Sequence, residues 1–437
     1  MFEIGRELKR FFQPGSPRDG LSLGDEALLE LLDLDLLIAE ARSADVAAGR
    51  IGEHDKARRL IEAAAVWREL ARRTGDPAAL RKSASCAEQA GQLARAADRG
   101  QVEALAICEQ ARSGLVGADL FGEDGLHAAA DHILRQAEQT EEVRALRASV
   151  QARLALGGSD PVVLHVAIED FGAALAGRSR LRASERLRLR LERAELLVAA
   201  GARLGDASMI GQALAEIAQL ISSLDGAYNP LRLARAHELR ALALMKLADM
   251  RGDAAAALGA LESLDAALEL TLPDHSPLDW ARLQHGRGLA LSALAEAGED
   301  ERAFLKALQA FGQALGVVGK HPHLALRATA VQDRVACMVR QAEARDDHFA
   351  LDEAEAVLRS ELAALKSPPE PLAWAVLQLN LARIYEAQAR ARGVDRGERA
   401  RAGEALLAAL DVFSESGMRS LANLAADGLE RIREGAF

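Results

Sequence analysis

The sequence has few aromatic residues and few cysteines, and each shortage narrows the range of structures. Aromatic residues make up 3% of the 437 residues, whereas hydrophobic residues of all kinds reach 50%. A core must therefore be built mainly from alanine and leucine, which suits closely packed helices. The three cysteines, Cys86, Cys108 and Cys337, lie far apart within helical patterns. This scatter is typical of buried thiols in a reducing compartment and not of a disulfide framework.

Long hydrophobic runs and catalytic motifs are also missing. No apolar run approaches the roughly 18–20 residues that cross a bilayer. The first residues lack the apolar stretch and cleavage site of a signal peptide, so we expect a cytoplasmic protein. The motifs G-x-S-x-G, H-E-x-x-H and C-x-x-C do not occur, and Gly319-Lys320 is followed by His321 where a phosphate-binding loop needs Ser or Thr. We therefore expect no enzymatic activity, no cofactor and no metal.

What the sequence does contain is a recurring triad of small, large and small residues. Ala307, Phe311 and Ala314 occupy positions i, i+4 and i+7, which share one face of a helix. Small residues let two helices approach closely, and the large residue fills the space between them. Related triads are Ser83/Ala87/Ala90, Ala130/Leu134/Ala137, Ala167/Phe171/Ala174, Ala213/Ile217/Leu220, Ala260/Leu264/Ala267, Ala354/Leu358/Glu361 and Ala402/Leu406/Ala409. In chain order and with Ala307 included, the first members of the eight triads are separated by 47, 37, 46, 47, 47, 47 and 48 residues.

An aspartate just before each second helix repeats with the same period. The aspartates are Asp76, Asp124, Asp160, Asp206, Asp253, Asp300, Asp347 and Asp395. Aspartate is a strong N-cap because its carboxylate accepts hydrogen bonds from the unpaired N–H groups of the first helical turn. Two markers with different physical causes share one period, and this predicts a repeat protein.

The predicted fold is an all-α solenoid, or superhelix, of about eight antiparallel helical hairpins with a period of about 47 residues. The hairpins are expected in residues 51–417. Residues 1–50 are expected to form N-terminal amphipathic and capping helices, and residues 418–437 a C-terminal capping helix with one polar face. The short step of 37 predicts a trimmed repeat near residues 124–156.

Two segments carry a resemblance to a known family. Pro371–Ala382 reads P-L-A-W-A-V-L-Q-L-N-L-A and resembles the W-A-x-x-Q-x-N-L-G opening of a bacterial tetratricopeptide repeat (TPR) variant. Pro277–Gln284 matches the first half of this motif, but Gly286-Arg287-Gly288 follows where N-L-G is usual. The period exceeds the roughly 34 residues of the standard unit, so each helix should be longer. The resemblance implies a right-handed superhelix whose concave groove, lined by first helices, holds a peptide or a partner helix. It implies neither catalysis nor a cofactor.

A column of arginines near the start of the first helices is the candidate partner-binding groove. Arg188, Arg235 and Arg282 are each 47 residues apart, and in a TPR-like register they point into the groove. With their neighbours on that face, the candidate residues are Arg188, Leu191, Arg235, Glu238, Leu242, Met245, Arg282, His285 and Leu289. Guanidinium groups beside apolar side chains favour an acidic amphipathic helix or an extended peptide as the ligand. The alternative is that these arginines only solvate an exposed face.

A second arginine column follows the same period and is interpreted differently. Its members are Arg147, Arg193, Arg240, Arg287 and Arg334. On a helical wheel Arg287 lies among Trp280, Leu283, Leu291 and Leu294, so its stem should rest on apolar surface while its head pairs with a carboxylate or a carbonyl. We interpret this column as a structural arginine ladder, and a ligand site is the alternative.

Other partners are left open by the sequence. Residues 2–12 form a basic amphipathic pattern that either caps the solenoid or contacts a membrane surface or a partner. Arg182, Arg186 and Arg190 stack at i, i+4 and i+8, as a solvated face or a phosphate contact would. No aromatic residues interleave with them to stack on bases, and the net charge of −11 argues against bulk nucleic-acid binding. A homo-oligomer is also left open.

An acidic N-terminal segment completes the functional hypothesis. Residues 25–48 are predicted to form one long helix, with acidic residues among the leucines of its first half. This helix either begins the core or lies in the arginine groove until the true partner displaces it. The sequence thus predicts a non-catalytic protein–protein interaction scaffold or adaptor. The alternative is a TPR-type regulatory protein that senses a peptide or contacts nucleic acid through its arginine-rich first helices.

Overall fold

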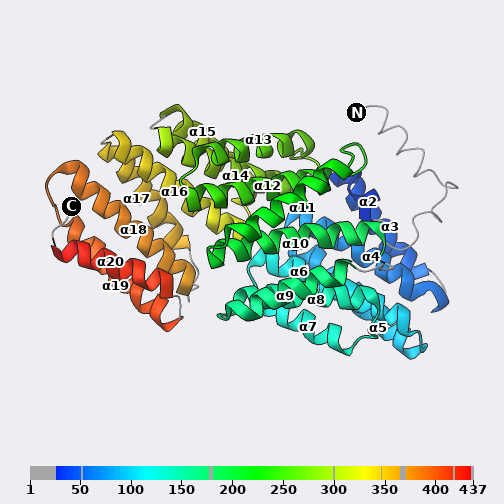
Figure 1. Cartoon of the computed structure of the whole chain (residues 1–437). Coiled ribbons are helices and arrows are strands. Elements are labelled where there is room, and N and C mark those ends of the chain that lie inside the picture. Colours follow the sequence, from blue (N-terminus) through cyan, green and yellow to red (C-terminus); the bar gives the residue numbers. More distant parts are fainter. Residues whose placement is uncertain are drawn as a thin grey trace. The chain divides into compact units, whose positions relative to one another are not determined.

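The computed structural model describes residues 26–50, 53–176, 181–298, 301–345, 347–364, 371–416 and 419–434. All regular secondary structure in these ranges is helical (Figure 1). None of the helices within them is both long enough and apolar enough to cross a membrane. The predicted amphipathic segment of residues 2–12 lies outside the described residues.

The described helices form eight antiparallel hairpins, each made of a first and a second helix. In chain order these are α4 (Glu53–Thr74) with α5 (Pro77–Ala96), α6 (Gly100–Phe121) with α7 (Gly125–Gln136), α8 (Glu141–Gly157) with α9 (Pro161–Ala176), α10 (Ala183–Leu204) with α11 (Ala207–Ser223), α12 (Pro230–Arg251) with α13 (Ala254–Leu270), α14 (Pro277–Gly298) with α15 (Glu301–Val318), α16 (Ala325–Arg345) with α17 (His348–Ala364), and α18 (Pro371–Arg392) with α19 (Glu398–Glu415). The fold is a TPR-like helical repeat, and the predicted fold class is confirmed.

The helix lengths explain the irregular step in the period. Six of the first helices contain 22 residues, as the long repeat requires. In contrast, α7 has 12 residues and α8 has 17, and these two helices are the trimmed repeat. The second hairpin begins at Gly100, because α5 continues to Ala96.

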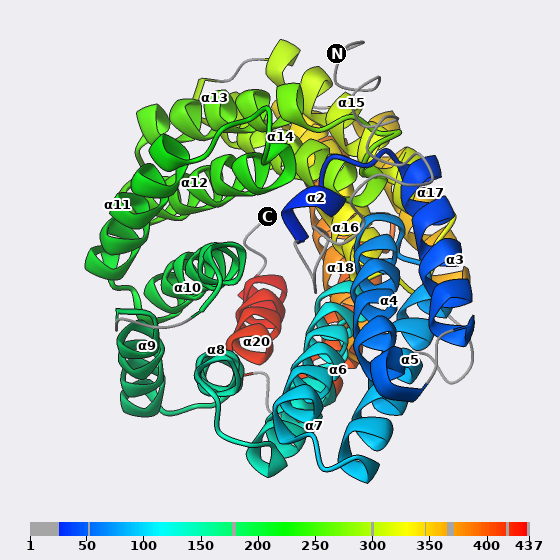
Figure 2. The same cartoon turned by 90° about the vertical axis from the view of Figure 1, so that its right-hand side faces the viewer.

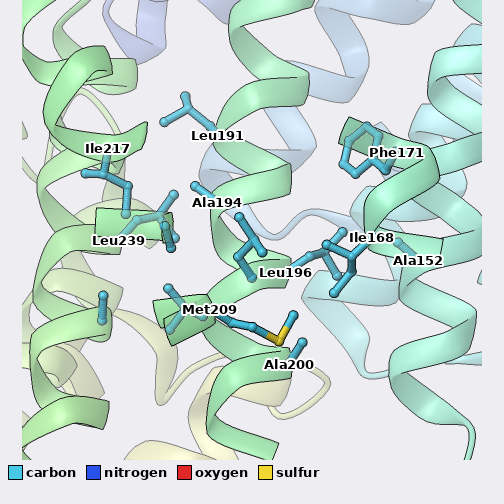
Figure 3. Packing of buried hydrophobic residues seen from close by; sticks show 14 of the residues in the cluster. Ala152, Ile168, Phe171, Leu191, Ala194, Leu196, Ala200, Met209, Ile217 and Leu239 are labelled. Carbon is cyan, nitrogen blue, oxygen red and sulfur yellow. The ribbon is translucent and has the colours of Figure 1, made fainter. Parts of the chain in front are cut away.

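The predicted triads form the core between the helices. Ala213, Ile217 and Leu220 of α11 are fully buried, and so are Ala307 and Phe311 of α15. Figure 3 shows Ile217 with Leu239 of α12, on the other side of α10 from Phe171 of α9. Ile217 thus packs between two consecutive hairpins.

Within a hairpin, a short turn with a glycine and a capping aspartate connects the first helix to the second. Gly205 and Gly252 adopt left-handed φ angles of 68° and 64° after α10 and α12, a conformation that glycine accepts without strain. The next residue in each case, Asp206 or Asp253, accepts hydrogen bonds from the first N–H groups of the following helix. Asp124 differs, because among the described residues its side chain makes no capping hydrogen bond.

The N-terminal segment forms two helices in place of the predicted one. They are α2 (Glu26–Leu29) and α3 (Leu34–Arg50), separated by a turn. The turn forms because Asp33 caps α3, its Oδ1 accepting a hydrogen bond of 2.8 Å from the backbone N–H of Leu36. At the other end, α20 spans Arg419–Glu434.

The chain divides into two compact units. Unit 1 is Met1–Leu283 and unit 2 is Gln284–Phe437, so the boundary falls within α14. In unit 1 the first helices α4, α6, α8, α10 and α12 form an inner layer, and the second helices lie outside them (Figure 2). Unit 2 has a core of its own, built from α16 to α20.

Candidate functional site

The inner helices of unit 1 enclose a cavity of about 270 Å³. Every first helix from α4 to α14 contributes to its wall, together with Glu30 from the turn after α2. This is the surface that a TPR-like repeat turns inward, because second helices cover the outside (Figure 2). The cavity is therefore the candidate functional site.

The wall of the cavity is densely charged but nearly balanced. Eight arginines contribute to it: Arg68, Arg72, Arg112, Arg153, Arg188, Arg232, Arg235 and Arg282. Seven acidic residues do so as well: Glu30, Glu69, Asp119, Glu192, Glu195, Glu238 and Asp279. A highly acidic ligand would have to compete with these carboxylates for the guanidinium groups.

The three arginines of the predicted groove column are all paired. Arg235 lies 2.7 Å from both Glu195 and Glu238. Arg282 lies 2.5 Å from Glu238 and 2.8 Å from Asp279. Glu238 thus bridges two consecutive repeats.

Arg188 belongs to a second group of ion pairs, which begins on α10. It contacts Glu192 and lies 2.7 Å from Glu185, which in turn lies 2.9 Å from Arg112 of α6. Arg112 also pairs with Glu142 of α8 at 2.5 Å. The charges on three first helices, α6, α8 and α10, are therefore linked through neighbouring side chains.

Burial and arginine contacts act in opposite directions on the carboxylates of the wall. Burial disfavours the ionised form of Glu195, but the neighbouring Arg235 and Arg153 outweigh it and lower its pKa to about 2. Glu69 behaves in the same way beside Arg72, with a pKa of about 2. Both carboxylates are therefore ionised at neutral pH.

Apolar side chains fill the spaces between the ion pairs. Leu115, Leu191 and Leu283 line the cavity and are almost fully buried. Val116 and Leu120 of α6 line it too and are only partly buried, so they present apolar surface that a ligand could cover.

The first hairpin of unit 1 contacts the α12–α14 region, and we call this line of contacts the seam. Arg72 of α4 donates two hydrogen bonds to Asp279 of α14, at 2.9 and 2.7 Å. Arg73 is fully buried and donates to the backbone carbonyls of Leu29 and Leu32 at 2.6 and 2.7 Å. Elements about 200 residues apart in sequence thus lie side by side, and α2 lies between them.

Glu30 completes this seam from the turn after α2. Its Oε2 accepts a hydrogen bond of 3.1 Å from the backbone N–H of Arg232, and its Oε1 lies 2.8 Å from Nη1 of Arg232. Its carbonyl oxygen accepts a hydrogen bond of 2.7 Å from Nε2 of His275. Burial raises the pKa of Glu30 to about 7, and Arg232 offsets only part of this effect.

Five of the nine predicted groove residues line the cavity: Arg188, Leu191, Arg235, Glu238 and Arg282. Leu242 is exposed and Met245 is partly buried, and neither belongs to the wall. His285 and Leu289 belong to unit 2, where Nε2 of His285 lies 2.7 Å from Oδ2 of Asp333.

The second arginine column is not uniform. Arg147 and Arg193 are partly buried and pair with Asp131 at 3.1 Å and Glu216 at 2.6 Å, as a structural ladder would require. Arg240 is exposed, whereas Arg287 and Arg334 of unit 2 are partly buried.

The basic run on α10 is also engaged in ion pairs. Arg190 lies 3.1 Å from Glu216, the same carboxylate that pairs with Arg193. Arg178 and Arg180, which extend the run in the sequence, lie outside the described residues.

No protein-family model and no curated protein matches the chain. Its structure is distantly similar to the apo form of RapI, with 12% identity, 87% of this chain and 99% of that chain covered, and a TM-score of 0.46. A Rap protein complexed with Competence and Sporulation Factor gives 12% identity, coverage of 86% and 98%, and a TM-score of 0.41. The human IFIT1 dimer with PPP-AAAA gives 13% identity, coverage of 90% and 89%, and a TM-score of 0.40. These similarities are too distant to indicate a ligand for this chain.

Several wall residues were missed by the sequence analysis. The positions three residues before the groove arginines are also charged and are occupied by Glu185, Arg232 and Asp279, of which Arg232 and Asp279 line the cavity. The period of these charged positions could have identified them from the sequence. Glu30 and Arg72 have no such sequence signal, because their partners are about 200 residues away and come close only when the helical repeats curve back on themselves.

Proposed function

We propose that unit 1 is a non-catalytic binding module that takes a short peptide segment of a partner protein into its cavity. The support is the cavity itself, in which partly buried apolar residues on α6 lie between paired charges. A peptide needs both kinds of surface, because its side chains seek apolar contacts while its backbone and charged groups need hydrogen bonds. The chain would then serve as a scaffold or adaptor.

The wall of the cavity also limits the charge of this ligand. We propose a few residues of an extended segment that cover Val116 and Leu120, the partly buried apolar residues of the wall. Because the wall arginines are already paired, we propose a ligand with one or two carboxylates beside apolar side chains and not a highly acidic one.

Substitution within the cavity tests this function. Val116→Phe adds a ring to the partly buried apolar wall, whereas Val162→Phe makes the same change on the exposed face of α9, where Val162 is 68% exposed. The probes are fluorescent amidated pentapeptides with one glutamate between leucines or valines. Fluorescence anisotropy should show binding to wild type, an affinity at least about tenfold weaker for Val116→Phe, and no change for Val162→Phe.

Two outcomes would contradict the proposal. Equal affinity of both variants for the peptides would place binding outside the cavity. Preferential binding of a single-stranded oligonucleotide in the same assay would favour the alternative of a regulatory protein that contacts nucleic acid.

A further inference from the structure

The segment that closes the seam of unit 1 also reaches the cavity. We call this segment the clasp, and it consists of α2 with the turn of residues 30–33. Arg73 of α4 contacts its carbonyl groups from one side, and Arg232 and His275 contact Glu30 from the other. Glu30 is 5% exposed and forms part of the cavity wall.

The carboxylate of Glu30 supplies what the N-terminus of α12 lacks. Asn229 precedes this helix, and in the described part of the chain its side chain makes no capping hydrogen bond. Pro230 has no N–H group, and Glu30 accepts the hydrogen bond from the N–H of Arg232. A helix N-terminus and a guanidinium both attract an anion. A carboxylate brought by a peptide would satisfy the same two groups.

The ionised carboxylate of Glu30 is destabilised at this site. Burial disfavours its ionised form, and Glu69 of α4 adds a nearby negative charge. Arg232 of α12 and Arg72 of α4 act in the opposite direction and only partly compensate. Burial reduces the free energy that the contact between Glu30 and Arg232 contributes. A ligand can therefore displace this contact more easily than an ion pair whose burial is fully compensated.

We propose that the clasp is an internal competitor of the peptide ligand, with Glu30 occupying the anchor at Arg232 that a ligand carboxylate would take. This inference rests on the proposed function. Peptide binding would displace the carboxylate of Glu30 from Arg232, while Leu29 and Leu32 stay packed against α4. Loss of Glu30 would leave the anchor open. Because the clasp is part of the same chain, its effective concentration is high, and a free peptide must overcome it.

The test uses the full chain and a peptide copied from the clasp, residues 27–32, in which Glu30 is the one acidic residue among leucines. The variants are Glu30→Ala and, as a control just after the clasp, Asp35→Ala, because Asp35 is an exposed residue of α3. Hydrogen exchange in residues 26–33 and 231–236 should be about three- to thirtyfold faster in Glu30→Ala, the range expected for a lost N-cap. It should be unchanged in Asp35→Ala.

Calorimetry with the same peptide tests competition. Glu30→Ala should bind it at least about tenfold more tightly than wild type or Asp35→Ala. A peptide with glutamine in place of its glutamate should lose this gain. A Glu30→Gln chain, which keeps a neutral acceptor for α12, provides a milder variant if Glu30→Ala unfolds.

Unchanged exchange in Glu30→Ala would show that Glu30 does not hold the seam, and equal peptide affinity in all chains would show that it does not compete. Either result overturns the inference. The proposed function would still stand if the pentapeptides bind wild type and Val116→Phe weakens them. It would fall if no pentapeptide binds, whatever the exchange data show.

Discussion

The carboxylate of Glu30 accepts a hydrogen bond from the backbone N–H of Arg232, a residue 202 positions further along the chain. This contact connects the segment before the first hairpin to the start of α12. Unit 1 is therefore more than a row of hairpins that touch only their neighbours, which is the usual description of a repeat protein. Its ends are joined, and the joint borders the cavity.

Arg73 should be the most sensitive residue of this joint. It is fully buried and donates hydrogen bonds to Leu29, Leu32 and Glu69. Arg73→Met leaves buried acceptors without a donor, so we expect a loss of about 3 kcal/mol or more in the free energy of unfolding. Urea unfolding measures this loss, with Arg81→Met on the exposed face of α5 as the control. A loss below about 1 kcal/mol would contradict the contacts of Arg73.

Gly288 should tolerate no side chain, although it lies inside a helix. A Cβ at this position would lie 2.7 Å from the ring of Phe311, the large residue of the α15 triad. Alanine normally stabilises a helix interior by about 1 kcal/mol relative to glycine, but here overpacking should cost about 1–3 kcal/mol.

Gly312 provides the matched control on α15. In the described structure a Cβ there meets no atom within 4 Å, so Gly312→Ala should stabilise by about 0.5–1 kcal/mol. Thermal unfolding of the two variants should thus show opposite shifts. Stabilisation by Gly288→Ala would mean that α14 and α15 do not approach as closely as the structure shows.

Stability should depend on pH through Glu30. Its pKa is about 7 when folded and about 4.5 when exposed, so the folded chain binds a proton that the unfolded chain releases. The resulting stabilisation is complete below pH 4.5 and is lost as the pH rises through 7. Between pH 5 and 8, wild type should lose about 2–3 kcal/mol relative to Glu30→Gln. Parallel pH profiles of the two chains would refute this assignment.

Arg235 should contribute to the stability of unit 1 as well as to the shape of the cavity. It lies between Glu195 and Glu238, and removing its charge leaves two carboxylates close together. We expect Arg235→Ala to cost about 3 kcal/mol in the free energy of unfolding, with Arg240→Ala in the exposed part of α12 as a neutral control. Equal stability of the two variants would show that the paired wall contributes little.

The fold was predictable because its signals are local and repeated. Buried triads such as Ala213, Ile217 and Leu220 and capping aspartates such as Asp253 act within one hairpin, so a single sequence shows their period. The break between α2 and α3 was missed because one residue, Asp33, decides it.

The site was only partly predictable, for a different physical reason. The period placed Arg188 and Arg235 on the inner face, and both line the cavity. Which carboxylates pair with them depends on the angle between successive hairpins. Contacts such as Arg72 with Asp279 depend on the sum of several such angles, which no sequence period contains.

The capping of α12 by Glu30 is tested most directly by the amide of Arg232. In a ¹⁵N-labelled chain this amide should shift with pH, with a midpoint of about 7 as the carboxylate of Glu30 titrates. The same amide should not titrate around pH 7 in Glu30→Gln. A shift of equal size and midpoint in both chains, or no shift in wild type, would contradict the account.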